Sequence, residues 1–127
     1  MSKLILIDDD PMYHKISQLM LKEYSVVKDV VSSTDGKATL DFLEENKEDA
    51  EKLPDYILVD LNMPGYSGWD FLNGFRRIRN SLKKAIRVYI VSSSIDPADI
   101  QRSKTYTFVN SFIIKPLSKE FLHELMA

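Results

Sequence analysis

The chain has 127 residues, of which 44% are hydrophobic and 28% are charged, and these values are ordinary for one soluble globular domain. The absence of cysteine excludes a disulfide scaffold, a thiolate metal site and a cysteine nucleophile. A net charge of -2 gives no general attraction to nucleic acid or membranes, and no apolar run approaches the ~20 residues that span a bilayer, so we expect a cytoplasmic protein without nucleic-acid binding or membrane insertion.

In the first half of the chain, short apolar runs alternate with helical spacing. Residues 4–7 predict a strand buried on both faces, and Asp10-Pro11 predicts a helix start with Asp10 as the N-cap. Residues 26–31 predict a second strand, whose internal Lys28-Asp29 suits a sheet edge. Thr34-Asp35-Gly36 then forms a turn into a second helix. The apolar positions of the two helices are Met12, Ile16, Leu19 and Met20, then Leu40 and Leu43.

The second half continues the alternation. Residues 56–59, 88–91 and 112–114 predict three further strands. A helix with Trp69, Leu72 and Phe75 inward follows the first of these strands, after a loop bracketed by Gly65 and Gly68. Asp96-Pro97 repeats the cap-then-proline helix start, and Ser118 is the expected cap of a short last helix with Phe121, Leu122 and Leu125.

Five strand–helix units in succession predict an α/β fold with a doubly wound parallel sheet, (βα)5, joined by right-handed crossovers. The expected strand order is 2-1-3-4-5, as in flavodoxin-like folds, which places the switch point between strands 1 and 3. We find no linker or repeat and expect residues 1–127 to form one domain, with no output domain after it.

Polar residues directly follow four of the predicted strands. They are Asp8 and Asp9, Asp60, Ser92 and Lys115. In an open α/β sheet, ligands bind outside the carboxyl ends of the strands, so these groups are expected to meet at one edge. Three carboxylates, one hydroxyl and one ammonium suit a divalent cation held beside a carboxylate that accepts a phosphoryl group. A single helix cap needs only one acid, so capping does not account for both Asp8 and Asp9.

With these motifs the chain resembles the receiver domain of two-component response regulators, of the CheY-like single-domain kind. The resemblance covers nearly the whole length. It is carried by the Asp8-Asp9 pair, the segment Asp60-Leu61-Asn62-Met63-Pro64-Gly65, Ser92 with the small Ser93 after it, and Lys115-Pro116.

The resemblance implies a role for each of these residues. Asp60 would be phosphorylated by a sensor histidine kinase or a histidine phosphotransfer protein, in a phosphorelay. Asp8, Asp9, Asp60 and the backbone carbonyl of Asn62 would hold Mg²⁺. Ser92 would hydrogen-bond the phosphoryl group, and Lys115 would pair with it. The chain would not be a conventional enzyme, although Mg²⁺-dependent self-phosphorylation and autodephosphorylation are expected.

The resemblance also implies a switch at Ser92 and Phe112, where the family more often has tyrosine in place of Phe112. Output would pass to a downstream protein through the face formed by the helix after Asp96, the strand 112–114 and the last helix. This face would include Ile100, Lys104, Phe112 and Phe121.

Three alternatives are set against this interpretation. A haloacid-dehalogenase-type phosphohydrolase uses an Asp-x-Asp pair, whereas these acids are adjacent. A flavodoxin-like FMN binder needs a Ser-, Thr- and Gly-rich loop where this chain has acids. The third alternative, a receiver-like binding module that works without phosphorylation, is opposed by the complete set of five site residues.

Charge is uneven along the chain, with six acids in residues 41–51 and six bases in residues 76–87. We interpret both as solvated helix ends with their loops. No aromatic residue interleaves with the bases in sequence, which argues against a nucleic-acid patch.

Overall fold

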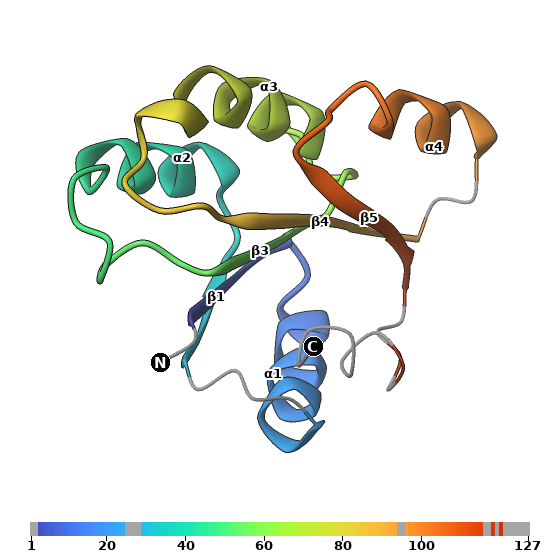
Figure 1. The fold of residues 1–127 in the computed structure, drawn as a ribbon. Helices are drawn as coiled ribbons and strands as arrows, with labels where there is room; N and C mark the ends of the chain where they lie inside the picture. The colour runs from blue at the N-terminus through green and yellow to red at the C-terminus, as the bar shows by residue number, and fades with distance from the viewer. Residues whose placement is uncertain (1–2, 25–28, 94–95, 116–117, 119, 121–127) are drawn as a thin grey trace.

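The computed structural model describes residues 3–24, 29–93, 96–115, 118 and 120. The helices and strands alternate along the chain (Figure 1). In order they are β1 (Lys3–Ile7), α1 (Pro11–Tyr24), β2 (Asp29–Ser33), α2 (Gly36–Glu45), β3 (Tyr56–Val59), α3 (Gly68–Ile78), the 3₁₀ helix η1 (Arg79–Ser81), β4 (Arg87–Ser92), α4 (Pro97–Ser103) and β5 (Val109–Ile114).

The five strands form one parallel sheet in the order β2-β1-β3-β4-β5, which confirms the predicted fold and topology. Helices α2, α3 and α4 lie along one face of the sheet and α1 lies on the other (Figure 1). Apolar side chains alternate between two buried clusters, because successive strand residues point to opposite faces. The larger cluster includes Ile57, Val59 and Phe71 beneath α2 and α3, and the smaller one includes Leu58 and Tyr89.

Several predicted boundaries differ from the observed ones. The second strand was predicted over residues 26–31 but runs from Asp29 to Ser33, and residues 25–28 lie outside the described ranges. The fifth strand begins at Val109, three residues before its apolar run. The helix predicted after Ser118, with Phe121, Leu122 and Leu125, also lies outside the described residues.

Leu19, one of the apolar positions of the first predicted helix, is not buried. Leu19 is 62% exposed, whereas its neighbour Met20 packs against the smaller cluster. Adjacent positions on a helix differ by about 100° in direction, so Met20 can face the sheet while Leu19 points away from it.

Among the described residues, no helix is both long and apolar enough to cross a membrane.

Side-chain caps fix the starts of three helices. The carboxylate of Asp35 accepts a hydrogen bond from the backbone N–H of Ala38 at the start of α2, and that of Asp96 accepts from Ala98 at α4. At α3, Ser67 and Asp70 form a reciprocal capping box. Because each such cap satisfies backbone groups that would otherwise lack partners, the loops at the carboxyl edge of the sheet end at defined points.

A bulge in β5 sets the direction of Phe112. Val109 lies opposite Val88 and Phe112 lies opposite Ile90, so four residues of β5 match three of β4. Residues three positions apart, such as Val109 and Phe112, point to opposite faces of a regular strand because the side-chain period is two, and the extra residue removes this difference. With it, both pack against the larger cluster, and Phe112 is half-buried beside the face that carries α4.

Candidate functional site at the carboxyl edge of the sheet

Backbone hydrogen bonds continue past the strand ends and position the polar side chains. The N–H of Asp8 donates to the carbonyl of Ser33, and that of Asp60 donates to Ile7, both at 2.9 Å. The N–H of Lys115 donates to the carbonyl of Ser92, also at 2.9 Å. Each residue is thus held at the edge of the sheet by the neighbouring strand.

Lys115 bridges two buried carboxylates. Its Nζ lies 2.7 Å from Oδ2 of Asp8 and 3.2 Å from Oδ2 of Asp60. The side chains of Asp8 and Asp60 are only 1% and 7% exposed. A carboxylate this deeply buried needs a charged or hydrogen-bonding partner, and one ammonium serves both.

A third carboxylate completes an acidic cluster. Carboxylate oxygens of Asp8, Asp9 and Asp60 all lie within 4.8 Å of one another, and Asp9 is exposed while the other two are buried. Three carboxylates against one lysine leave the cluster with an excess of negative charge. Hard oxygen ligands in this number fit Mg²⁺, which is bound through a few carboxylates and keeps several waters.

Burial and charge together shift two pKa values in this cluster. Burial raises the pKa of the Asp60 carboxyl above its ordinary 3.8; Lys115 opposes this shift, while the charge of Asp8 adds to it, and the net direction is upward. Burial alone would lower the pKa of Lys115, but its hydrogen bond to Asp8 and the charges of Asp60 and Asp8 outweigh burial and raise it above 10.5. The carboxylate of Asp60 is therefore held in an environment that disfavours its own negative charge.

The loop after Asp60 folds back against the strand end. The N–H of Asn62 donates to Oδ1 of Asp60 at 3.3 Å, and the N–H of Gly68 donates to the carbonyl of Leu61 at 3.1 Å. Gly65 adopts a φ of +79°, a left-handed conformation that glycine tolerates without strain. The loop thereby returns the chain to the start of α3 directly beside the phosphoacceptor candidate.

The remaining predicted site residues lie on β4, on β5 and in the loop after β3. Ser92 ends β4 fully buried, opposite Ile114 of β5. Asn62 is exposed in the loop, and Phe112 lies below the edge, opposite Ile90. Asp8, Asp9, Asp60 and Lys115 are thus brought into one cluster. The predicted roles of Ser92 in phosphoryl binding and switching, of Asn62 in metal binding and of Phe112 in switching stay predictions.

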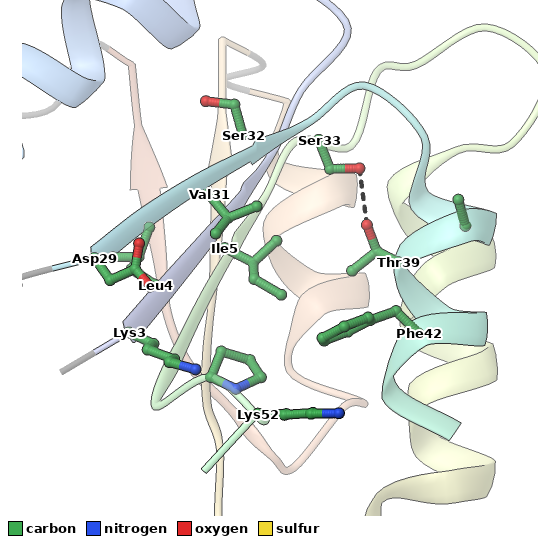
Figure 2. A pocket seen from close by; sticks show the side chains of 12 residues that line it. Lys3, Leu4, Ile5, Asp29, Val31, Ser32, Ser33, Thr39, Phe42 and Lys52 are labelled. Carbon is green, nitrogen blue, oxygen red and sulfur yellow. Dashed lines mark hydrogen bonds between the residues drawn. The ribbon is translucent and has the colours of Figure 1, made fainter. Parts of the chain in front are cut away.

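A cavity lined by described residues lies elsewhere. Its volume is about 320 Å³, and it opens between β2 and α2, with Val31 and Phe42 on facing walls (Figure 2). None of the acids of the cluster lines it. The cluster itself is at the carboxyl edge of the sheet.

Sequence reasoning missed the structural role of Gly68. A Cβ at this position would overlap the carbonyl oxygen of Asp60 and lie 2.7 Å from the Cα of Leu61. Only glycine allows α3 to begin this close to the strand end. The sequence signal was the adjacent capping box of Ser67 and Asp70, which marks Gly68 as the first helical residue rather than a loop residue.

The family model of the response regulator receiver domain matches residues 4–127. The chain therefore belongs to the response regulator receiver domain family of two-component signal transduction.

Solved structures and curated proteins agree with this assignment. A two-component response regulator from Cytophaga hutchinsonii is 30% identical, with a TM-score of 0.86, and the match covers 98% of this chain and 92% of that one. The phosphorylated cyanobacterial phytochrome response regulator RcpA is 29% identical, with a TM-score of 0.76 and coverage of 98% and 88%.

Among curated proteins, the probable methanogenesis regulatory protein FilR2 of Methanothrix harundinacea is 36% identical over 69% of this chain and 55% of its own length. The two-component response regulator ORR1 of Oryza sativa is 28% identical over 98% of this chain and 53% of its own length. The chain thus spans about half the length of the curated relatives that it matches first.

Proposed function

We propose that this receiver domain accepts a phosphoryl group on Asp60, in a Mg²⁺-dependent reaction, from the phosphohistidine of a sensor kinase or a histidine phosphotransfer protein. The observation that carries the proposal is the position of Asp60. Its carboxylate is buried, lies within 4.8 Å of the carboxylates of Asp8 and Asp9, and is contacted by Lys115 at 3.2 Å. Few structural roles need three acids this close together at the ends of two adjacent strands.

In the proposed reaction, a carboxylate oxygen of Asp60 attacks the phosphorus atom of the donor. The new O–P bond forms as the N–P bond to the donor imidazole breaks, and the imidazole nitrogen keeps the bonding electron pair. The product is an aspartyl phosphate, a mixed anhydride. The ammonium of Lys115 offsets the charge that accumulates on the transferring group, because it already lies between Asp60 and Asp8.

Asp8, Asp9, Asp60 and the backbone carbonyl of Asn62 are the proposed ligands of Mg²⁺. The ion supplies charge neutralisation between the carboxylates and the phosphoryl oxygens. Support comes from the donor set, since all three acids offer oxygen and their ligand atoms lie within 4.8 Å of one another. The chain's own contribution is to hold these oxygens in place through the strand-end hydrogen bonds of Asp8 and Asp60.

The proposed output is a change in protein–protein contacts. Ser92 would hydrogen-bond the phosphoryl group, and Phe112, as the second switch residue, would transmit the effect of phosphorylation to the face of α4 and β5. Ile100 and Lys104 contribute to this face from α4 and its end; Phe121, predicted on its third element, lies outside the described residues. We expect a downstream protein partner there, and the cytoplasm as the location.

The first test is the mass of the intact protein after incubation with acetyl phosphate and Mg²⁺, beside an Asp60→Asn variant. The proposal predicts one added phosphoryl group that is absent in the variant and is suppressed by a chelator. Failure to add mass to the wild-type protein, together with unchanged amide chemical shifts on adding beryllofluoride, would favour the phosphorylation-independent binding module.

A further inference from the structure

A row of aromatic rings lies between α3 and the segment that leads into β5. The rings of Trp69 and Tyr106 stack with centroids 5.8 Å apart, and Tyr106 meets Phe108 edge-on at 6.0 Å. Tyr106 and Phe108 are buried and Trp69 is half-buried. In Figure 1 this region lies on the face of the sheet that carries α3 and α4. These contacts hold the three rings in fixed positions beneath the side chains that cover them.

Each ring is covered by an exposed arginine. The guanidinium carbon of Arg102 lies 4.3 Å from the ring centre of Trp69, that of Arg76 lies 4.8 Å from Tyr106, and that of Arg79 lies 5.3 Å from Phe108. Stacking on a ring uses the flat side of a guanidinium and leaves its N–H edges directed outward. The three arginines come from α4, α3 and η1, so the fold, and not one helix, assembles this arginine face.

A hydrogen-bond network holds the centre of the arginine face. Oδ1 of Asn73 accepts hydrogen bonds from a terminal nitrogen of Arg76 and from the hydroxyl of Tyr106, both at 2.9 Å. Arg76 is thus restrained by its ring and by Asn73 together. Much of the side-chain entropy that a flexible arginine loses on binding has been lost already, which favours recognition by this face.

Arg76, Arg79 and Arg102 form no ion pair with another described residue. In the described ranges, every ion pair uses a lysine, namely Lys37, Lys83, Lys84 or Lys115. Lys83 and Lys84, from the same basic run, pair with Glu48 and Asp55. Arg76, Arg79 and Arg102 instead gather three positive charges on one patch of a protein whose net charge is -2.

We propose that the arginine face of Arg76, Arg79 and Arg102 binds an acidic peptide segment of a partner protein through its carboxylates. The planar N–H edge of a guanidinium matches a carboxylate in bidentate geometry. A nucleic acid fits less well, because the flat ring faces that could stack on bases are already covered by arginine and the protein as a whole is negative. None of the three arginines belongs to the cluster of Asp8, Asp9 and Asp60, and the proposed binding requires no phosphoryl group on Asp60.

The test uses fluorescein-labelled octaglutamate as the probe, with fluorescence anisotropy and the indole N–H signal of Trp69, the only tryptophan, as readouts. The triple variant Arg76→Gln, Arg79→Gln, Arg102→Gln is compared with Lys22→Gln, Lys47→Gln, Lys52→Gln, which removes the same charge from exposed lysines elsewhere. We expect the arginine triple to weaken binding at least tenfold and the lysine triple less than twofold. The wild-type indole signal should shift on binding.

A second variant guards against loss of folding. Replacing the three arginines by lysine keeps the charge but removes the planar fork, and we expect it to weaken binding about threefold or more. The proposal would be overturned if the variant with three arginines replaced by glutamine and the variant with three lysines replaced by glutamine weakened binding equally. Binding would then follow net charge alone. Tighter binding of a fluorescein-labelled eight-nucleotide single-stranded DNA than of octaglutamate would overturn it in favour of a nucleic-acid surface.

Discussion

Gly68, the first residue of α3, packs directly against the backbone of Asp60. A Cβ on Gly68 would overlap the carbonyl oxygen of Asp60 and lie 2.9 Å from its carbonyl carbon. The N–H of Gly68 also donates to the carbonyl of Leu61 at 3.1 Å. The start of α3 and the backbone of Asp60 are therefore in contact without any intervening side chain, so a displacement of one must displace the other.

Substituting Gly68 by alanine should destabilise the protein by about 2 kcal/mol, the usual scale of overpacking. The clash is with backbone atoms, which cannot rotate away. Gly74 of the same helix offers a matched control, because a Cβ there would overlap the end of the Leu40 side chain, which can change rotamer. Urea unfolding should give a smaller loss for Gly74→Ala. Equal losses would mean that the contact with Asp60 has no special rigidity.

Replacing Lys115 by methionine should destabilise the metal-free protein by about 3 kcal/mol, because it leaves the buried carboxylates of Asp8 and Asp60 without their common cation. Mg²⁺ should restore part of the loss by supplying positive charge to the same acids. Thermal unfolding of both proteins in a chelator and in excess Mg²⁺ measures this. A loss that Mg²⁺ leaves unchanged would argue that Lys115 acts mainly by packing.

The pH dependence of this loss has a definite sign. The pKa of Lys115 is raised in the folded protein above the ordinary 10.5, so its contribution to stability is fully present below pH 10.5 and disappears as the pH rises through the folded value. The difference between wild type and Lys115→Met should therefore be constant near neutrality and shrink only at strongly alkaline pH. Urea unfolding of both proteins in chelator, from pH 7 upward, would show it, and a gap that already closes between pH 7 and 9 would contradict the raised pKa.

In the absence of divalent cations, Asp60→Asn should stabilise the protein at pH 7, by about 1 kcal/mol. The pKa of Asp60 is raised in the folded state, so its contribution is favourable below the unfolded value of 3.8 and is lost as the pH rises through the folded value. The advantage of the variant should vanish below pH 3.8. Urea unfolding in chelator at pH 3 and pH 7 measures both points, and a less stable variant at pH 7 would refute the expectation.

The fold and the position of the acidic cluster were predictable because both follow from local signals. The apolar runs before Asp8, Asp60, Ser92 and Lys115 are short and bounded by turn residues, so the strands could be ordered by the rules for parallel sheets. Once the strands are parallel, residues at their carboxyl ends must share one edge. Once these residues share one edge, their proximity and opposite charges are enough to explain why Lys115 bridges Asp8 and Asp60.

Features that depend on distant contacts were not predictable. The bulge in β5 shows only in the pairing with β4, because nothing in Val109-Asn110-Ser111 marks an extra residue. The argument against a nucleic-acid patch in residues 76–87 rested on the absence of aromatic residues between these bases in sequence, and this reason was incomplete. Tyr106 and Phe108 reach Arg76 and Arg79 through the fold.

The last prediction separates the two acids that follow β1. Asp9 is exposed, whereas Asp8 is buried and bonded to Lys115 and to the N–H of Asp10. If both hold Mg²⁺, Asp9→Asn should weaken Mg²⁺ binding at least tenfold, about 1.4 kcal/mol, and change the metal-free stability by less than about 0.5 kcal/mol. Asp8→Asn should weaken Mg²⁺ binding and also alter stability, because it removes a charged partner of Lys115. Isothermal titration with Mg²⁺ and urea unfolding in chelator distinguish the two effects, and unchanged Mg²⁺ affinity in Asp9→Asn would remove Asp9 from the proposed ligands.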